Sequence, residues 1–412
     1  MPEFLSLVTP QEALEMLLSR LNVKRAWENI SADQALGKIT AEDICSPQNL
    51  PDFRRSTVDG YALRARDTHG ASEGLPAYLD LVGEIIMGQA PDFSISQAQC
   101  GLIHTGGMLP DGATAVVMLE DSQALETGEI EILKPAAPGD NLIEIGEDIK
   151  EGEIVIPGGT RLRPAEIGGL LAVGITELSV IKPPLIGVIS SGDEVIPPDH
   201  EPRLGQVRDI NSYTLGALIQ DLGARVGHYG IIPDSREALR DVMARALDEC
   251  DHLIVTAGSS ASARDLTAEI MNELGDPGVF VHGLQIRPGK PTILALAGQK
   301  VMIGLPGNPV SALVIAQVMV KPILEYLLGL HHPRPRPLVA AELTVNIPSQ
   351  AGREDWIPVR LIEGSSGNSQ AEPIFGRSNL IFILARADGL VRIPPAVTGL
   401  EAGAVVSVRL MV

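Results

Sequence analysis

The stretch Leu185-Ile186-Gly187-Val188-Ile189-Ser190-Ser191-Gly192-Asp193-Glu194 decides the fold expected for the centre of the chain. Its first five residues are apolar and typical of a buried strand, and a polar turn that contains glycine follows directly. The pattern recurs where residues 252–256 lead into 257–260, and where residues 301–305 lead into 306–309. In an open parallel sheet such turns line the carboxyl edge, where ligands bind. We therefore expect a functional site at that edge.

Helical patterns alternate with these strands. One follows Asn211, one follows the capping-box pattern Asp234-x-x-Glu237, and the last begins at Asn308-Pro309 with a kink expected at Pro322. The four expected apolar faces run from Leu215 to Leu222, Leu239 to Leu247, Leu266 to Leu274 and Asn308 to Leu328. Alternating strands and helices of this length predict a doubly wound α/β domain.

The flanking regions have other patterns. Thr9-Pro10-Gln11-Glu12 predicts a helix start, and residues 154–159 resemble a hairpin before a short helix that opens at Pro164. Short β-type runs separated by Gly, Pro and Asp fill the region before that hairpin. We expect a discontinuous N-terminal domain of residues 1–46 and 150–180, an inserted mostly-β domain of 47–149, the α/β domain of 181–329 and, after a proline-rich linker, a C-terminal β domain of 338–412.

Composition limits the possible functions. The 412 residues carry a formal charge of −20, with a pI near 4.8, which argues against nucleic acid and anionic membranes as partners. An anionic ligand must therefore be held locally, by backbone N–H groups, a few Arg or Lys, or a divalent cation. The three cysteines have no C-x-x-C spacing, no basic leader precedes the first helix, and no apolar run reaches ~18 residues. These features predict a soluble, cytoplasmic protein with buried thiols.

Acidic side chains follow three expected strands. Glu194, Asp234 and Asp265 each come just after a strand, so a parallel sheet would bring them to one edge. Clustered carboxylates repel one another unless a cation lies between them, which favours a Mg²⁺ site. The alternatives are plain ones: residues 191–194 are also typical of a tight turn, and Asp234 is also a good helix N-cap.

Three segments are suited to binding anions. Gly258-Ser259-Ser260 offers backbone N–H groups and hydroxyls before a helix, although its spacing matches no phosphate-loop motif. Arg287-Pro288-Gly289-Lys290-Pro291 places two cations on a rigid turn, and Pro306-Gly307-Asn308-Pro309 directs a helix N-terminus outward. An ordinary hairpin and a plain helix cap remain the alternatives for the last two.

Taken together, the motifs resemble the MoeA/gephyrin E-domain family of molybdopterin molybdenumtransferases. The resemblance extends over nearly the whole chain, and its specificity comes from the order of the motifs. They are Ala35 to Lys38, Leu50-Pro51, Ser56 to Tyr61, Thr105 to Gly107, Gly146 to Asp148, Ser191 to Glu194, Asp265, Pro288 to Pro291, Leu305 to Ser311 and Ala385 to Leu390.

The resemblance implies an enzyme of molybdenum cofactor biosynthesis that inserts molybdate, or tungstate, into adenylylated molybdopterin and releases AMP with the help of Mg²⁺. It implies an elongated homodimer with a MogA-like α/β domain, in which Asp59 and Thr105 face the other subunit. The implied catalytic residues are Asp59, Asp148, Glu194, Asp234, Asp265 and Arg287, with Glu194 and Asp265 on the metal. The implied binding residues are Thr105, Gly192, Gly258, Ser259, Ser260, Pro288, Gly289, Lys290, Pro306, Gly307, Asn308 and Pro309.

Two positions depart from the family pattern. Residues 257–264 replace a glycine-rich sequence that many members have, and Arg287 stands where lysine is common. Two other functions stay open. One is a MogA-like or CinA-like nucleotide transferase or hydrolase, and the other is a non-catalytic dimeric scaffold.

Overall fold

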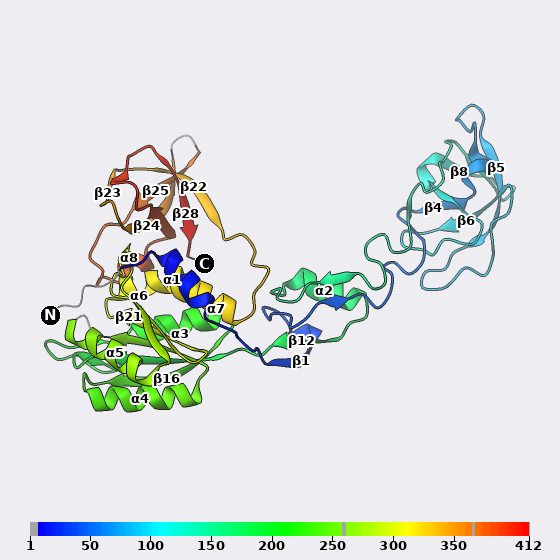
Figure 1. Cartoon of the computed structure of the whole chain (residues 1–412). Coiled ribbons are helices and arrows are strands. Elements are labelled where there is room, and N and C mark those ends of the chain that lie inside the picture. Colours follow the sequence, from blue (N-terminus) through cyan, green and yellow to red (C-terminus); the bar gives the residue numbers. More distant parts are fainter. Residues whose placement is uncertain (1–6, 258–260, 365–366, 412) are drawn as a thin grey trace.

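The computed structural model describes residues 7–257, 261–364 and 367–411, with only the backbone for 261–264. The molecule is elongated (Figure 1). An α/β domain and the C-terminal β domain pack together at one end, and an arm leads from them to a separate β domain at the other. The elongated multidomain architecture and the α/β-plus-β fold class are as predicted.

The central sheet has the strand order β16-β13-β17-β21-β20-β18. The first four strands are parallel, and β20 and β18 run antiparallel to their neighbours. The strands are β13 (Leu185–Ser191), β16 (Arg225–Ile232), β17 (His252–Ala257), β18 (Pro277–His282), β20 (Ile293–Ala297) and β21 (Lys300–Pro306). The antiparallel edge was not predicted; it arises because Gly298, at φ +62°, turns the chain tightly between β20 and β21.

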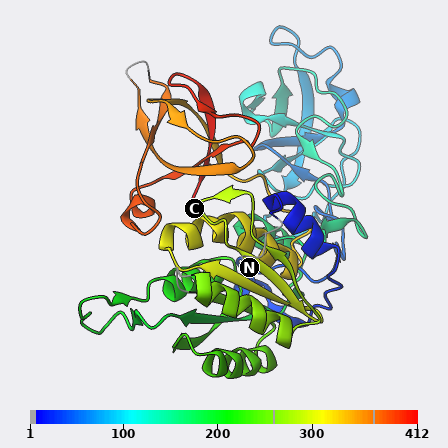
Figure 2. The same ribbon diagram turned by 60° about the vertical axis from the view of Figure 1, so that its left-hand side comes forward.

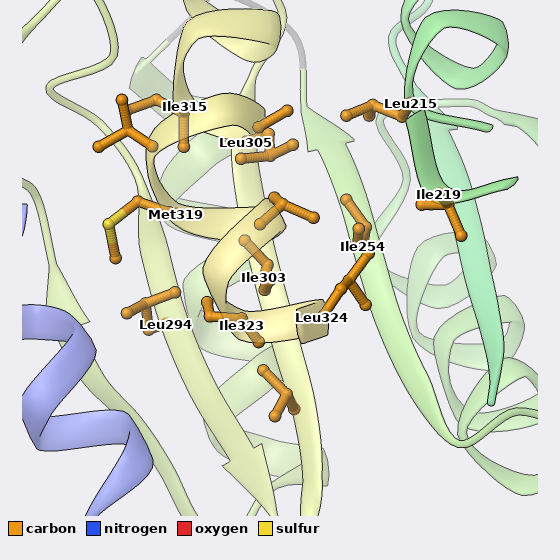
Figure 3. Close-up of a cluster of buried hydrophobic side chains, with 14 of the residues drawn as sticks. Leu215, Ile219, Ile254, Leu294, Ile303, Leu305, Ile315, Met319, Ile323 and Leu324 are labelled. Atoms are coloured by element: carbon orange, nitrogen blue, oxygen red, sulfur yellow. The ribbon is translucent and has the colours of Figure 1, made fainter. Parts of the chain in front are cut away.

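Helices cover both faces of this sheet, as a doubly wound fold requires. They are α3 (Asn211–Asp221), α4 (Arg236–Glu249), α5 (Ala261–Leu274), α6 (Pro309–Ile315) and α7 (Lys321–Leu327). Leu215 of α3 and Ile323 of α7 pack with Ile254 and Ile303 of the sheet in one core (Figure 3). Leu239 and Met243 of α4 pack with residues of α5 in a second core.

A π-helical segment, Ala316–Val320, joins α6 to α7, so the chain from Pro309 to Leu327 is one continuous helix. The π-helical segment stands where a kink at Pro322 was expected. Proline has no N–H to donate to the Val318 carbonyl, so the regular α-helical hydrogen bond is missing there. The helix is long and apolar enough to pass as a membrane span. However, 67% of its most apolar window is buried inside the protein, as in a core helix.

The arm contains two small sheets and one helix. Strand β1 (Trp27–Ser31) pairs with β12 (Glu177–Ile181), and β2 (Ile44–Cys45) pairs with β11 (Ile154–Ile156) beside α2 (Pro164–Ala172). The hairpin predicted at residues 154–159 was wrong, because β11 pairs with the distant β2. Cys45 is exposed, whereas Cys100 and Cys250 are buried as expected.

The β domain at the end of the arm is a six-stranded sheet of order β7-β4-β6-β5-β9-β8. Its strands are β4 (Gly60–Leu63), β5 (Ala77–Glu84), β6 (Gln99–Ile103), β7 (Ala115–Met118), β8 (Ser122–Ala124) and β9 (Glu129–Ile132). The chain enters and leaves it beside the short pair β3 (Arg55–Ser56) and β10 (Leu142–Ile143). The 3₁₀ turns of the arm and this domain are Ala32–Gln34, Ala65–Thr68 and Leu119–Asp121.

The C-terminal domain is also a six-stranded sheet, of order β19-β24-β25-β22-β28-β26. The strands of this sheet are β19 (Ile286–Arg287), β22 (Leu338–Leu343), β24 (Glu354–Glu363), β25 (Ser369–Pro373), β26 (Gly389–Ile393) and β28 (Val405–Leu410). The domain also contains a separate pair, β23 (Ile347–Pro348) and β27 (Gly399–Leu400), and helix α8 (Phe382–Ala385). One expected strand, Leu343 to Ile347, is instead the turn between β22 and β23. Figure 2 shows this domain against the side of the α/β domain that carries α6. Strand β19 precedes the linker yet pairs with β24.

Helix α1 (Pro10–Leu18) packs on the α/β domain. Thr9 and Glu12 form the predicted capping box at its start. The helix ends before Leu21, which is nevertheless buried in the same core.

Candidate active site

Strand register places the predicted turns at one edge of the central sheet. Ser190 of β13 lies opposite Thr256 of β17, and Ala257 of β17 lies opposite Pro306 of β21. Ser191 lies opposite Ile232, the last residue of β16. The segments that follow these four parallel strands therefore share the carboxyl edge, as the sequence predicted. The strand spacing of ~4.8 Å puts the ends of β13 and β21 ~10 Å apart.

An acidic cluster forms where β13 and β16 end. The Asp234 backbone N–H donates to Asp193 Oδ1 at 3.1 Å, and Ser191 Oγ donates to Asp234 Oδ1 at 3.3 Å. Burial raises the pKa of Asp234, and the charges of Asp193 and Glu194 raise it further, while the Ser191 hydroxyl opposes the shift. The three carboxylates are thus close enough to repel one another.

Asp234 is not the helix cap that the sequence also allowed. Helix α4 begins at Arg236 behind Ser235, and no side chain caps it. The predicted capping box with Glu237 was therefore wrong. The Asp234 carboxylate faces Ser191 and the acidic cluster instead, which leaves it available for a ligand.

Sequence reasoning missed a buried polar network beneath this cluster. The Asp209 side chain accepts hydrogen bonds from Ser190 Oγ at 2.9 Å, from Ser212 Oγ at 2.5 Å and from the Ser212 backbone N–H at 3.2 Å. Ser190 also contacts Thr256 Oγ1 at 3.2 Å. The network ties β13, β17 and the start of α3 together, so it fixes the floor of the site. The pattern Asp209-x-Asn211 before a helix was the available signal.

Asn211 joins this network to the loop after β21. Its Nδ2 donates to the Gly307 carbonyl at 2.8 Å, whereas its buried Oδ1 has no hydrogen-bond partner among the described residues. Buried acceptors without a partner are uncommon in folded proteins. The amide therefore holds the Pro306–Pro309 loop and presents a vacant acceptor beside it.

A basic cavity of about 1040 Å³ opens on the other side of this loop, between the α/β and C-terminal domains. Arg287, Lys290, Arg353 and Arg377 line it, with no carboxylate among its described lining residues. Arg353 Nε lies 2.9 Å from Oδ1 of the buried Asp355, and Arg287 Nη1 lies 3.8 Å from its Oδ2. Asp355 itself does not line the cavity. Four cations around one cavity in a chain of charge −20 favour an anion as its ligand.

The Arg287–Pro291 turn is held in place by glycine. Gly289 has φ +111°, and a Cβ at this position would lie 2.3 Å from Ile315 Cγ1 of α6. Because only glycine fits, the turn lies directly on the helix that follows Pro306–Pro309. Asn308 and Ser311 from that helix start, and Pro288, Gly289 and Lys290 from the turn, line the same cavity. The structure thus brings the predicted binding residues Asn308, Pro288, Gly289 and Lys290 together.

The other predicted residues of this sheet edge differ in their positions relative to the cluster. Gly258, Ser259 and Ser260 lie outside the described residues. Asp265 is exposed near the start of α5, which follows β17, and its part in a metal site with Glu194 stays a prediction. Gly192 lies in the turn after β13, where a Cβ would lie 2.9 Å from Glu194 Oε2.

The site suits a Mg²⁺ ion shared with a substrate better than a metal held by protein alone. The described residues contain no group of three or more His, Cys, Asp or Glu that could hold a metal ion. Mg²⁺ is, however, commonly bound by one or two carboxylates together with substrate phosphates. Burial is the main cause that raises the pKa of Asp234, and such an ion would relieve the further increase that comes from the charges of Asp193 and Glu194.

Asp59 and Thr105 lie in the β domain at the far end of the arm, remote from the acidic cluster of the same chain (Figure 1). Asp59 Oδ1 accepts the Thr105 backbone N–H at 2.8 Å, and this bond is the main cause that lowers the pKa of Asp59. His104 lies beside them and contacts Glu84 at 2.9 Å. Asp148 is exposed where the arm meets this domain, and its backbone N–H donates to the Leu50 carbonyl.

Family models match three successive parts of the chain. Residues 8–174 match the MoeA N-terminal region (domain I and II), residues 187–326 match a "Probable molybdopterin binding domain", and residues 340–411 match the MoeA C-terminal region (domain IV). Together these matches span nearly all of the described chain.

Known proteins match over most or all of their length. A molybdopterin molybdenumtransferase of Staphylococcus epidermidis is 30% identical, over 98% of this chain and 95% of the relative. One of Haemophilus influenzae is 31% identical, over 85% of each. A crystal structure of a molybdopterin biosynthesis MoeA protein from Pyrococcus horikoshii superposes with a TM-score of 0.85 at 31% identity, over 98% of this chain and all of that one.

Proposed function

Because the chain belongs to the MoeA family, we propose that it inserts molybdate into adenylylated molybdopterin and releases AMP with the assistance of Mg²⁺. It is a transferase of molybdenum cofactor biosynthesis that acts on a molybdopterin substrate. We propose three further features: that a metal oxyanion is the second substrate, that molybdopterin is adenylylated, and that Mg²⁺ assists the reaction.

One arrangement carries the proposal: the acidic cluster and the basic cavity lie at the same edge of the sheet, with the ends of β17 and β21 between them. The reaction needs both environments. A phosphoanhydride with its Mg²⁺ suits carboxylates, and a metal oxyanion suits cations. The acidic cluster follows β13, and Asn308, directly after β21, lines the basic cavity, so one extended substrate would have to span at least the ~10 Å between the ends of these two strands.

The proposed roles follow from these positions. Glu194 and Asp234 would hold Mg²⁺ against the phosphoanhydride, with Asp265 as a further candidate ligand, and bound Mg²⁺ would supply charge that favours departure of AMP. Arg287 and Lys290, with Arg353 and Arg377 opposite, hold molybdate. Charge-assisted N–H bonds orient its oxygens.

Gly258–Ser260 and the Pro306–Pro309 loop hold the phosphates and the pterin side of the substrate in this scheme. Asn211 Oδ1 offers an acceptor to a substrate N–H beside that loop. Arg287 in place of lysine presents a planar fork instead of a point charge. We propose molybdate as the substrate and tungstate, a tetrahedral dianion like molybdate, as an alternative one.

Two subunits complete the site in this proposal. Asp59, Thr105 and Asp148 lie along the arm and at its end, so within one chain they cannot close over the acidic cluster (Figure 1). A homodimer in which each arm reaches the partner's α/β domain would bring them there. We place the protein in the cytoplasm, in keeping with three free cysteines, of which two are buried.

The test is AMP release from adenylylated molybdopterin, measured with Mg²⁺ and molybdate present together and with each omitted. The proposal requires both, with molybdenum recovered on the product. AMP release that does not depend on molybdate would favour a nucleotide hydrolase instead. No turnover, together with capture of a protein partner, would favour a scaffold.

A further inference from the structure

A second cavity lies at the opposite edge of the central sheet. It has a volume of about 680 Å³ and is lined where β16, β17 and β21 begin, by Arg225, His252 and Lys300. It cannot be part of the proposed active site, because parallel strands place their amino ends and their carboxyl ends at opposite edges of the sheet. Its volume lies within the ~300–1,000 Å³ range of small-molecule pockets.

Five cations line this cavity: Lys24, Arg25, Lys182, Arg225 and Lys300. None of the five has an ion-pair partner among the described residues. Arg25 and Lys300 donate to backbone carbonyls at the ends of α7 and α4, which occupies two N–H groups of each side chain. Among the described residues, Arg225 donates only its Nε, to the Pro183 carbonyl at 3.3 Å.

The other polar groups of the cavity offset at most one of these five charges. Its one carboxylate, Asp251, accepts the Leu185 backbone N–H at 2.7 Å. The Val301 N–H donates to Nδ1 of the buried His252, so the uncharged imidazole carries its proton on Nε2 as a donor. The cavity therefore offers positive charge and N–H donors in a chain whose net charge is strongly negative.

The cavity also lies at the root of the arm. Residues 22–26 connect α1 to β1, and residues 182–184 connect β12 to β13; both connections line it. Lys24 lies on the first connection, Lys182 on the second and Arg225 on the α/β domain. One ligand that contacts all three would join the arm to the domain.

We propose that this cavity binds a phosphate dianion, free or carried as a phosphomonoester, through Lys24, Lys182 and Arg225. Two ammonium groups and a guanidinium whose Nη atoms have no partner in the described part of the chain provide donors on several sides of a tetrahedral dianion. The remaining volume, beside Pro183 and Pro184, accommodates an organic group. The bound anion fixes the arm against the α/β domain.

The test is calorimetric titration of the full-length protein with inorganic phosphate, ribose 5-phosphate and ribose as the neutral control. We expect both anions to bind and ribose not to bind. Equal affinities assign the site to free phosphate, and tighter ribose 5-phosphate binding assigns it to a phosphomonoester. The triple variant K24Q/K182Q/R225Q should bind at least tenfold more weakly.

The matched control is R208Q, because Arg208 is exposed and also donates only its Nε, to the His200 carbonyl at 3.2 Å. It should bind as the unaltered protein does. Should the triple variant not fold, judged by its thermal transition, the single variant K182Q decides, since Lys182 is exposed and has no ion pair among the described residues. Absence of binding by either anion overturns the proposal, as does unchanged binding by the charge-removed variant.

Two further readouts locate the anion. Binding that survives K24Q/K182Q/R225Q and is lost in K290Q/R377Q would place the phosphate in the other basic cavity and overturn the proposal. At saturation, amide exchange over residues 22–31 and 177–184 should slow in the unaltered protein and not in the triple variant. Exchange that does not change would overturn the bridge between the arm and the domain.

Discussion

Asp193 accepts the backbone N–H of Asp234 at 3.1 Å, a contact that joins the turn after β13 to the turn after β16. The contact keeps the Asp234 carboxylate beside Asp193 and Glu194, whose charges help to raise its pKa. The acidic cluster is therefore held together by the backbone against the repulsion of its own charges.

Asp234→Asn should separate stability from activity. The substitution removes one of three mutually repelling charges, so the thermal midpoint of the metal-free protein should stay the same or rise. AMP release should fall about 100-fold, because a carboxylate that helps to hold Mg²⁺ is lost. Asp248→Asn, at an exposed position of α4, is the control and should leave both unchanged. Full activity of the Asp234 variant would exclude its proposed role.

Mixing two inactive variants tests whether each site is shared between subunits. Asp59→Asn and Asp234→Asn alter opposite ends of the elongated molecule. A dimer with one chain of each variant would therefore hold one intact site and one doubly altered site. Random exchange makes half of the dimers mixed, and about a quarter of the normal activity should return. A mixture as inactive as its parents, after exchange is verified by mass, would place the whole site within one chain.

We expect molybdate binding to depend on the positive charge of Arg287 more than on the planar shape of its guanidinium. Its side chain is 63% exposed and lies 3.8 Å from Asp355 at the wall of the basic cavity. Arg287→Gln should weaken molybdate binding about tenfold, and Arg287→Lys by less than threefold, measured by titration calorimetry. Arg360→Gln, which alters an exposed pair with Glu372, is the control. Equal losses for the Lys and Gln variants would show that the guanidinium fork matters.

Asp209→Ala should destabilise the fold through its unpaired neighbours. The substitution leaves the hydroxyls of Ser190 and Ser212 without their carboxylate acceptor in a buried site, at a cost of about 2–3 kcal/mol. Chemical denaturation measures the loss. The triple change with Ser190→Ala and Ser212→Ala should recover part of it, and a further loss in the triple variant would contradict this account.

His252 should make stability depend on pH. Burial lowers its pKa to about 4 from the ordinary 6.5, so the folded state holds the neutral imidazole while the unfolded state takes up a proton. Its contribution is present above pH 6.5 and is lost as the pH falls toward 4. Between pH 7 and pH 5 the protein should lose about 2 kcal/mol more than His252→Asn, in phosphate-free buffer. Parallel pH curves would assign the acid sensitivity to other groups.

The central fold could be predicted because strand and helix periods are local. Three buried strands with polar ends and the helices between them appear directly in residues 185–328, and register then brings their turns together. The antiparallel strands β20 and β18 escaped prediction, because an apolar run carries no sign of its direction. The pairing of β11 with β2 escaped it as well, since the partners lie far apart in the sequence.

The site was only partly visible in the sequence for the same reason. Glu194, Asp234 and the Arg287–Pro291 turn stand out as charged groups near strand ends. Arg353 and Arg377 do not, because nothing in the sequence shows that the C-terminal domain packs against this edge. Asp209 and Asn211 passed as ordinary residues before a helix, and only the folded chain reveals the buried network around them.

Strand β19 has a mechanical consequence. It is part of the α/β segment by sequence, yet it adds to the C-terminal sheet, and it carries Arg287. A motion that separates the two domains would first have to break the pairing of β19 with β24. The basic cavity between the domains therefore cannot widen by such a motion to admit its ligand. If the C-terminal domain were exchanged for that of a relative, β19 would have to pair with a strand of the relative's sheet. The exchanged segment should therefore also include residues 284–291.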